Sequence, residues 1–128
     1  MTAFETGTVA VPGATLWYKT WGSGPVVLML QGGSADADGG DTIAPFLADH
    51  FKLIAYDRRG LARSSIDNPE APLQLQTHGE DVHHLLAALS SGPALLFGSS
   101  IGALVGLDVV TRHPEQVHTL VAHEPPLP

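Results

Sequence analysis

The sequence contains no cysteine, which excludes disulfide bonds, thiolate zinc sites and a cysteine nucleophile. Basic residues are also scarce: six Lys and Arg stand against thirteen Asp and Glu, and the formal net charge is −7. A chain without a basic stripe cannot neutralise many phosphates. We therefore expect neither nucleic acid nor a membrane surface as a partner.

Long apolar runs are missing as well. The longest aliphatic run, residues 26–30, is far shorter than the roughly 20 residues that span a bilayer. Residues 1–13 have neither the basic start nor the apolar stretch of a secretory signal. With 44% hydrophobic and 15% charged residues, the composition is that of a globular domain. We expect a cytoplasmic protein whose partner is a small-molecule substrate.

Short apolar strands alternate with helical stretches along the chain. This alternation predicts an α/β fold, a three-layer α/β/α sandwich built on a mostly parallel sheet. Pro12 and Gly13 join the first two strands into an antiparallel N-terminal hairpin. The predicted strands are residues 4–11, 15–21, 25–30, 52–56, 94–97 and 117–122, and the predicted helices are residues 41–50, 76–89 and 101–112.

A Gly-x-Ser-x-Gly motif, residues 98–102, follows the fifth predicted strand. A chain with fourteen glycines can contain this pattern by chance, but its place between a buried strand and an apolar helix makes it much stronger. Ser100 then sits on a sharp turn that brings Gly98 and Gly102 close together. The turn lifts the Ser100 hydroxyl above the sheet and presents the Ile101 amide, at a helix start, to a developing oxyanion.

Two further segments stand where the same architecture needs them. The glycine segment, residues 31–34 (Gln-Gly-Gly-Ser), follows the third strand, and the arginine loop, residues 57–64, closes the fourth. With the Ser100 motif, they resemble the His-Gly-Gly, Asp-x-Arg-Gly-x-Gly-x-Ser and nucleophile-elbow motifs of α/β-hydrolases. Gln31 replaces the usual histidine and Ala62 the second glycine of the loop, and neither change removes the backbone amides.

The resemblance implies that Ser100 is the nucleophile and that the amides of Ile101, Gly32 and Gly33 form the oxyanion hole. The charges of the arginine loop would tie down a turn near the site. The family order is serine, acid, histidine, with the acid usually after strand seven and the histidine after strand eight. Residues 1–128 would then be the N-terminal part of the core domain, strands one to six of an incomplete α/β-hydrolase fold. Strands seven and eight and any lid would be absent.

Two residues near the end of the chain are candidates for the remaining catalytic roles. His123 ends the sixth predicted strand and points out of the same sheet edge as Ser100, which makes it a candidate base. Glu124 follows it and is a candidate acid. The histidines of the predicted helix at residues 76–89 are interpreted as an exposed polar face: His78, His83 and His84.

The predicted function is hydrolysis of an ester-like acyl substrate through an acyl intermediate on Ser100, with no cofactor and no metal. Two alternatives stay open: a truncated or split fragment without turnover, and a ligand-binding protein of the same fold. The sequence does not distinguish ester hydrolysis from carbon–carbon hydrolysis or perhydrolysis. The apolar strand at residues 117–122 would be an exposed edge, so we expect self-association or a complementing C-terminal half.

Overall fold

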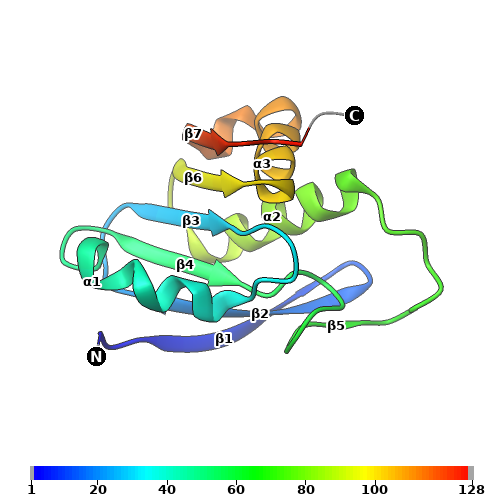
Figure 1. Cartoon of the computed structure of the whole chain (residues 1–128), viewed down its shortest axis with the longest axis horizontal. Helices are drawn as coiled ribbons and strands as arrows, with labels where there is room; N and C mark the ends of the chain where they lie inside the picture. Colours follow the sequence, from blue (N-terminus) through cyan, green and yellow to red (C-terminus); the bar gives the residue numbers. More distant parts are fainter. Residues whose placement is uncertain (1, 127–128) are drawn as a thin grey trace.

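The computed structural model describes residues 2–126 and contains the predicted mixed sheet with helices on both faces (Figure 1). The strands are β1 (Glu5–Val11), β2 (Ala14–Trp21), β3 (Val26–Leu30), β4 (Lys52–Tyr56), β5 (Ser65–Ile66), β6 (Ala94–Ser99) and β7 (Val117–His123). They lie in the order β1-β2-β4-β3-β6-β7, and the short β5 pairs with β2. The sheet is antiparallel from β1 to β4 and parallel from β4 through β3 and β6 to β7.

The N-terminal hairpin forms as predicted. β1 and β2 pair antiparallel with Val11 opposite Ala14 at the closed end. Gly13 in the turn has φ +81°, a left-handed conformation that glycine adopts without strain. β2 is largely buried, whereas β1 alternates between exposed and half-buried residues, because β1 is the outer strand of the sheet.

Helices cover both faces of the sheet, which confirms the predicted three layers. Those of one face are α2 (Leu75–Leu89) and α3 (Ile101–Arg112), and those of the other are η1 (Ala37–Thr42) and α1 (Ala44–Leu47). A last 3-10 turn, η2 (Pro114–Gln116), leads into β7. No helix in the described part of the chain combines the length and the hydrophobicity that a membrane crossing requires.

The core is divided in two by the sheet, because successive strand residues point to opposite faces. One cluster joins the inward face of α2 and α3 to strand residues that include Leu28, Ile54 and Leu96. The other joins their sequence neighbours Val27 and Leu53 to Trp21, Ala37 and Ala44 on the side of η1 and α1. The alternation within β3 and β4 thus supplies both layers with buried side chains.

The predicted helix at residues 41–50 is wrong in extent. The chain forms the 3-10 helix η1 and then the four-residue α1. Asp36 caps η1 by accepting a hydrogen bond from the Asp38 amide at 2.9 Å. Pro45 lies in the first turn of α1, where its ring is tolerated but prevents an earlier helix from continuing through it. The short strand β5 was also not predicted, since its segment is polar and rich in proline.

One histidine of α2 contradicts the interpretation of an exposed polar face. His78 is buried, with 7% of its surface exposed, while His83 and His84 are half-buried. Burial lowers the pKa of His78, and the nearby Arg58 guanidinium lowers it further. His78 is therefore an uncharged part of the packing between α2 and the arginine loop.

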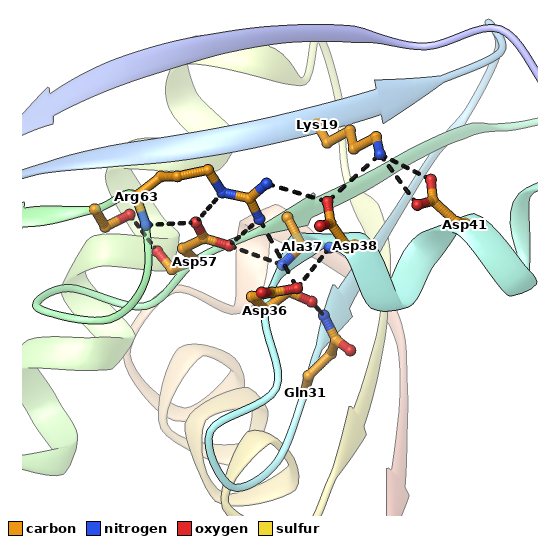
Figure 2. Close-up of polar contacts among 9 residues, drawn as sticks. Lys19, Gln31, Asp36, Ala37, Asp38, Asp41, Asp57 and Arg63 are labelled. Atoms are coloured by element: carbon orange, nitrogen blue, oxygen red, sulfur yellow. Dashed lines mark hydrogen bonds and ion pairs between the residues drawn. The ribbon is translucent and has the colours of Figure 1, made fainter.

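Asp57, at the end of β4, joins the arginine loop to η1. Its side chain is fully buried; one oxygen accepts a hydrogen bond from the Ala37 amide and the other from Arg63 Nε, each at 2.8 Å. The same guanidinium reaches Asp38 at 3.1 Å. Figure 2 shows the Asp57 carboxylate between Arg63 and the start of η1. These contacts fix η1 to the C-terminal end of β4, beside the glycine segment.

The Asp57 carboxyl is ionised in the folded protein. Burial acts to raise its pKa, but the hydrogen bonds from Arg63 and from the Ala37 amide outweigh burial, and the pKa lies below its ordinary value. A lowered pKa in the folded state means that ionisation stabilises the fold above the unfolded pKa, about 3.9. That stabilisation is lost as the pH falls through the lower pKa of the folded state.

Replacing Asp57 by Asn is expected to lower the free energy of unfolding by about 2 kcal/mol at neutral pH, since Arg63 loses its buried ionic partner. Urea denaturation followed by circular dichroism measures this loss. The difference from the unmodified chain is expected to shrink below about pH 4, where the Asp57 carboxyl of the unfolded chain becomes protonated, and to vanish below the lower pKa of the folded state. Asp49→Asn, at an exposed position, is the matched control. Equal effects of the two substitutions would contradict a structural role for Asp57.

Candidate active site

Ser100 lies at the junction of β6 and α3, exposed to solvent, with backbone angles of φ +56° and ψ −124°. For a residue with a side chain, such a conformation costs about 1–3 kcal/mol. Two hydrogen bonds hold it: the Ser100 amide donates to the His123 carbonyl at 3.0 Å, and the Ser100 carbonyl accepts from the Ala103 amide at 2.9 Å. The structure therefore has the strand, sharp turn and helix that the motif predicts.

The two glycines of the motif lie where no side chain fits. A Cβ atom on Gly98 would be 2.5 Å from the carbonyl oxygen of Gly102 and 2.8 Å from Ala103 Cα. A Cβ atom on Gly102 would collide with the carbonyl group of Leu30, at the end of β3. These neighbours are backbone atoms, so they cannot move aside without shifting β3 or α3. The close contact of β3, β6 and α3 holds the Ser100 turn in place.

The glycine segment packs against the serine. A Cβ atom on Gly32 would be 2.8 Å from Ser100 Cβ and 3.6 Å from Ser100 Oγ. Gly33 follows with φ +57°, a conformation that favours glycine. Ile101 is the first residue of α3, where helical amides have no partner within the helix. The structure thus brings together all four residues expected for the nucleophile and the oxyanion hole.

Arg58 holds the glycine segment by its carbonyl groups. Its Nη1 donates to the Gln31 carbonyl at 2.7 Å, and its Nη2 donates to the Gly33 carbonyl. Between them, the Gly32 carbonyl accepts from the Ala35 amide at 3.2 Å. A peptide unit is planar and trans, so fixing these three carbonyls also fixes the direction of the amide that follows each one. The amides of Gly32 and Gly33 are among them.

The two departures from the family pattern have visible consequences. The Gln31 side chain donates a hydrogen bond to the Asp36 carbonyl and so closes the loop that carries the glycine segment. Ala62 adopts φ +48°, where the family pattern has a glycine that would take this conformation without strain. The strained turn at Ala62 immediately precedes Arg63, which is bound to Asp57. Both departures leave the backbone near Ser100 in place.

His123 and Glu124 lie close to the Ser100 turn. His123 is opposite Ser99 in the pairing of β6 with β7, and its Nδ1 is 3.4 Å from Ser99 Oγ. Glu124 is exposed and has φ +48°. Within residues 2–126, the hydrogen bonds of His123 reach the Ser99 hydroxyl and the Ser100 amide, but not the Ser100 hydroxyl.

Arg58 is a site residue that the sequence did not reveal. Two arginines follow Asp57, and their identity does not tell which one faces the glycine segment. Arg59 faces the other way: it binds both carboxylate oxygens of Asp81 at 2.8 Å and the Pro12 carbonyl at 2.7 Å. The two arginines lie where β4 has ended and a turn begins, closed by the hydrogen bond from the Leu61 amide to the Arg58 carbonyl at 2.9 Å, so no strand alternation in the sequence tells which of them faces the glycine segment.

The chain is similar to proteins of known sequence from a bacterium and from man. It shares 47% identity over 119 residues with the "Uncharacterized hydrolase YraK" of Bacillus subtilis (strain 168), covering 93% of this chain and 44% of that protein. It shares 35% identity over 121 residues with the human "Serine hydrolase-like protein", covering 93% of this chain and 60% of that protein. The chain spans about half the length of these relatives.

A solved structure and a family profile agree with this similarity. The thioesterase domain from the curacin biosynthetic pathway superposes with a TM-score of 0.89 and 27% identity, over 98% of this chain and 48% of that chain. The profile of the family described as "alpha/beta hydrolase fold" matches residues 25–128. The match includes the glycine segment, the arginine loop and the Ser100 turn. The chain therefore belongs to the α/β-hydrolase family.

Proposed function

We propose that this chain carries the nucleophile of a serine hydrolase that acts on ester-like acyl substrates. One observation carries the proposal: Ser100 is exposed on a strained turn, and Gly32 packs directly against its side chain. Membership of the α/β-hydrolase family supports a hydrolase, and similarity to a thioesterase domain supports acyl chemistry.

The arrangement of amides around Ser100 suits acyl transfer. Attack of the Ser100 hydroxyl on a carbonyl carbon forms a tetrahedral intermediate with a negatively charged oxygen. The Ile101 amide would donate to that oxygen from the start of α3, where the helix dipole is positive. The amides of Gly32 and Gly33 would donate from the other side. Arg58 orients the first through the Gln31 carbonyl, and the Ala35 amide orients the second through the Gly32 carbonyl. Expulsion of the leaving group gives acyl-Ser100, which water then hydrolyses.

A base must accept the proton of the Ser100 hydroxyl, because a neutral serine is a weak nucleophile. His123 is the candidate within the chain: its ring would turn from Ser99 toward Ser100, and Glu124 would be the acid. The other source is a complementing C-terminal half, as expected from the family order of the triad.

A non-catalytic role, as a ligand-binding protein or as a split part without turnover, is the second candidate. The contact between His123 and Ser99 favours it, since it leaves the Ser100 hydroxyl without a histidine partner in the described residues. Loss of a triad member typically reduces turnover by several orders of magnitude. A reagent that reacts with activated serines separates the two roles.

A fluorophosphonate probe is expected to label Ser100, because it reacts with serines whose hydroxyl is activated. Mass spectrometry of the labelled peptide identifies the modified residue. Ser100→Ala is expected to abolish labelling, and Ser99→Ala, one position earlier, is expected to retain it.

Labelling of the chain by itself would indicate an internal base, and His123→Gln should then prevent it. His118→Gln, an exposed histidine of the same strand, is the matched control. Labelling only after a C-terminal half is added would indicate a split enzyme. If neither preparation is labelled, Ser100 is not the nucleophile and the binding role is favoured.

Arg58→Gln is expected to slow Ser100 labelling about 100-fold, because an oxyanion amide that loses its orientation stabilises the transition state less. Arg58→Lys keeps one donor and is expected to recover part of the rate. The melting temperature reports stability separately. Arg59→Gln, which breaks the pair with Asp81, is expected to lower the melting temperature instead. Labelling of Arg58→Gln at the unmodified rate would refute the positioning role.

The outer side of β7 supports the expected self-association. β7 is the last strand of the sheet within residues 2–126. Phe97 of β6 and Val121 of β7 are paired in register, and they are 41% and 43% exposed. A free strand edge beside exposed apolar side chains pairs readily with another polypeptide, either a second copy or a complementing half.

Sedimentation velocity of the chain is expected to show association that increases with concentration. Val121→Lys should reduce it, because a lysine on the edge disfavours strand pairing. Leu107→Lys is the matched control, since Leu107 is also 43% exposed but belongs to α3. A monomer at every concentration, or equal effects of the two lysines, would contradict association through β7.

A further inference from the structure

A second group of chemically capable side chains lies between α2 and the end of α3. Glu80 and His83 are three residues apart on α2, and His113 is the C-cap of α3. One carboxylate oxygen of Glu80 and one nitrogen from each imidazole all lie within 4.8 Å of one another. All three residues are half-buried, so the group is fixed by its surroundings yet open to solvent.

The side chains of this cluster already contact one another through atoms that can bind a metal ion. His113 Nε2 is 2.7 Å from Glu80 Oε2, so a proton lies between them. The hydrogen bond from His113 lowers the pKa of Glu80, which keeps its carboxylate ionised. The rings of His83 and His113 are stacked with centroids 3.8 Å apart and an angle of 7° between planes.

A neighbouring glutamine fixes the tautomer of His83. The Gln116 side-chain amide nitrogen donates to the His83 backbone carbonyl at 3.1 Å. Its oxygen is therefore the atom that lies 3.0 Å from His83 Nδ1, and it accepts the Nδ1 proton. In the neutral ring this leaves Nε2 with a free lone pair. A hydrogen bond from the distal ring nitrogen to a carbonyl oxygen is the arrangement that orients metal-ligating histidines.

We propose that Glu80, His83 and His113 form a site for a borderline divalent transition metal, of which Zn²⁺ is the representative ion. Two imidazole nitrogens and one carboxylate are ligands that Zn²⁺ prefers, whereas Mg²⁺ and Ca²⁺ prefer oxygen ligands. The ion takes the place of the proton between His113 and Glu80, and that proton is released on binding. Gln116 acts behind His83, and Glu115 Oε1 lies 3.7 Å from His113 Nδ1.

Binding requires a local rearrangement that can be observed. A bound metal lies in the plane of each imidazole ring, and two parallel rings cannot share such a position. The stack of His83 and His113 must therefore open from its 7° angle. Arg112 Nη1, 3.3 Å from Glu80 Oε1, competes for the carboxylate, but its Nη2 remains anchored to Asp108 and the Gln76 carbonyl.

The site is separate from Ser100 and would act on the fold rather than on the substrate. Ser100 and His113 flank opposite ends of the twelve-residue α3, about 18 Å apart at 1.5 Å per residue. Figure 1 shows α2 and α3 beside each other on one face of the sheet. A metal there would cross-link α2 to the junction of α3 with η2.

Isothermal titration of the full chain with ZnCl₂, free of any polyhistidine tag and treated first with a chelator, tests the proposal. One Zn²⁺ per chain is expected to bind, with release of protons. A Co²⁺ complex should show the visible absorption of a tetrahedral site. Gln116→Leu is expected to weaken Zn²⁺ binding about tenfold or more, because the second-sphere hydrogen bond is lost. His83→Gln and His113→Gln should weaken it further.

His50→Gln is the matched control, since His50 is exposed and outside the cluster. Circular dichroism establishes that each variant is folded, and the nuclear magnetic resonance signals of the two imidazoles report the opening of the stack. The proposal is overturned if no Zn²⁺ binds, or if His50→Gln reduces binding as much as His83→Gln. Unchanged His83 and His113 signals on saturation would overturn it too.

Discussion

The approach of bare backbone segments around Ser100 is the constraint on which the rest of the site depends. Gly98 and Gly102 let β3, β6 and α3 come closer together than any side chain would permit, and Gly32 lets the glycine segment reach the serine. This packing is made by main-chain atoms, so it does not depend on rotamers. The position of the Ser100 turn is therefore set by the backbone of β3, β6 and α3.

Loops around that centre are held by charge rather than by hydrophobic contact. Three of the six basic residues of the chain lie in the arginine loop, and they bind different partners: Arg58, Arg59 and Arg63. The first binds the carbonyls of the glycine segment, the second binds α2 through Asp81, and the third binds η1 through Asp57. Carbonyl and carboxylate oxygens near the site thus accept hydrogen bonds from charged arginine side chains, which are stronger than hydrogen bonds between neutral groups.

The sheet and the long helices could be predicted from the sequence because their signals are local. The predicted strand at residues 52–56 and the predicted helix at residues 101–112 agree with β4 and α3 at both ends. The short helices near Pro45 depend on packing that no periodicity encodes. The same holds for His113, which meets Glu80 across 33 residues of sequence. The burial of His78 does follow from helical spacing, since His78 lies four residues before Val82 and seven before Leu85 on the buried face of α2, and the interpretation as an exposed polar face overlooked this. Motif spacing placed Ser100 beside Gly32, but the direction of the Arg58 side chain needed coordinates.

The positive φ angle of Ser100 has a consequence for how the sequence is interpreted. Glycine would occupy this conformation without strain, so a chain optimised only for folding would carry glycine at position 100. Serine lowers the stability of the turn, and among the described residues 2–126 its side chain makes no hydrogen bond that would offset the strain. Natural proteins retain residues that lower stability in this way mainly at functional sites. Ala62 and Glu124 have positive φ angles as well, so strain alone does not identify a reactive residue. At Ser100 the strain coincides with an exposed hydroxyl beside Gly32, and this combination agrees with the proposed role as nucleophile.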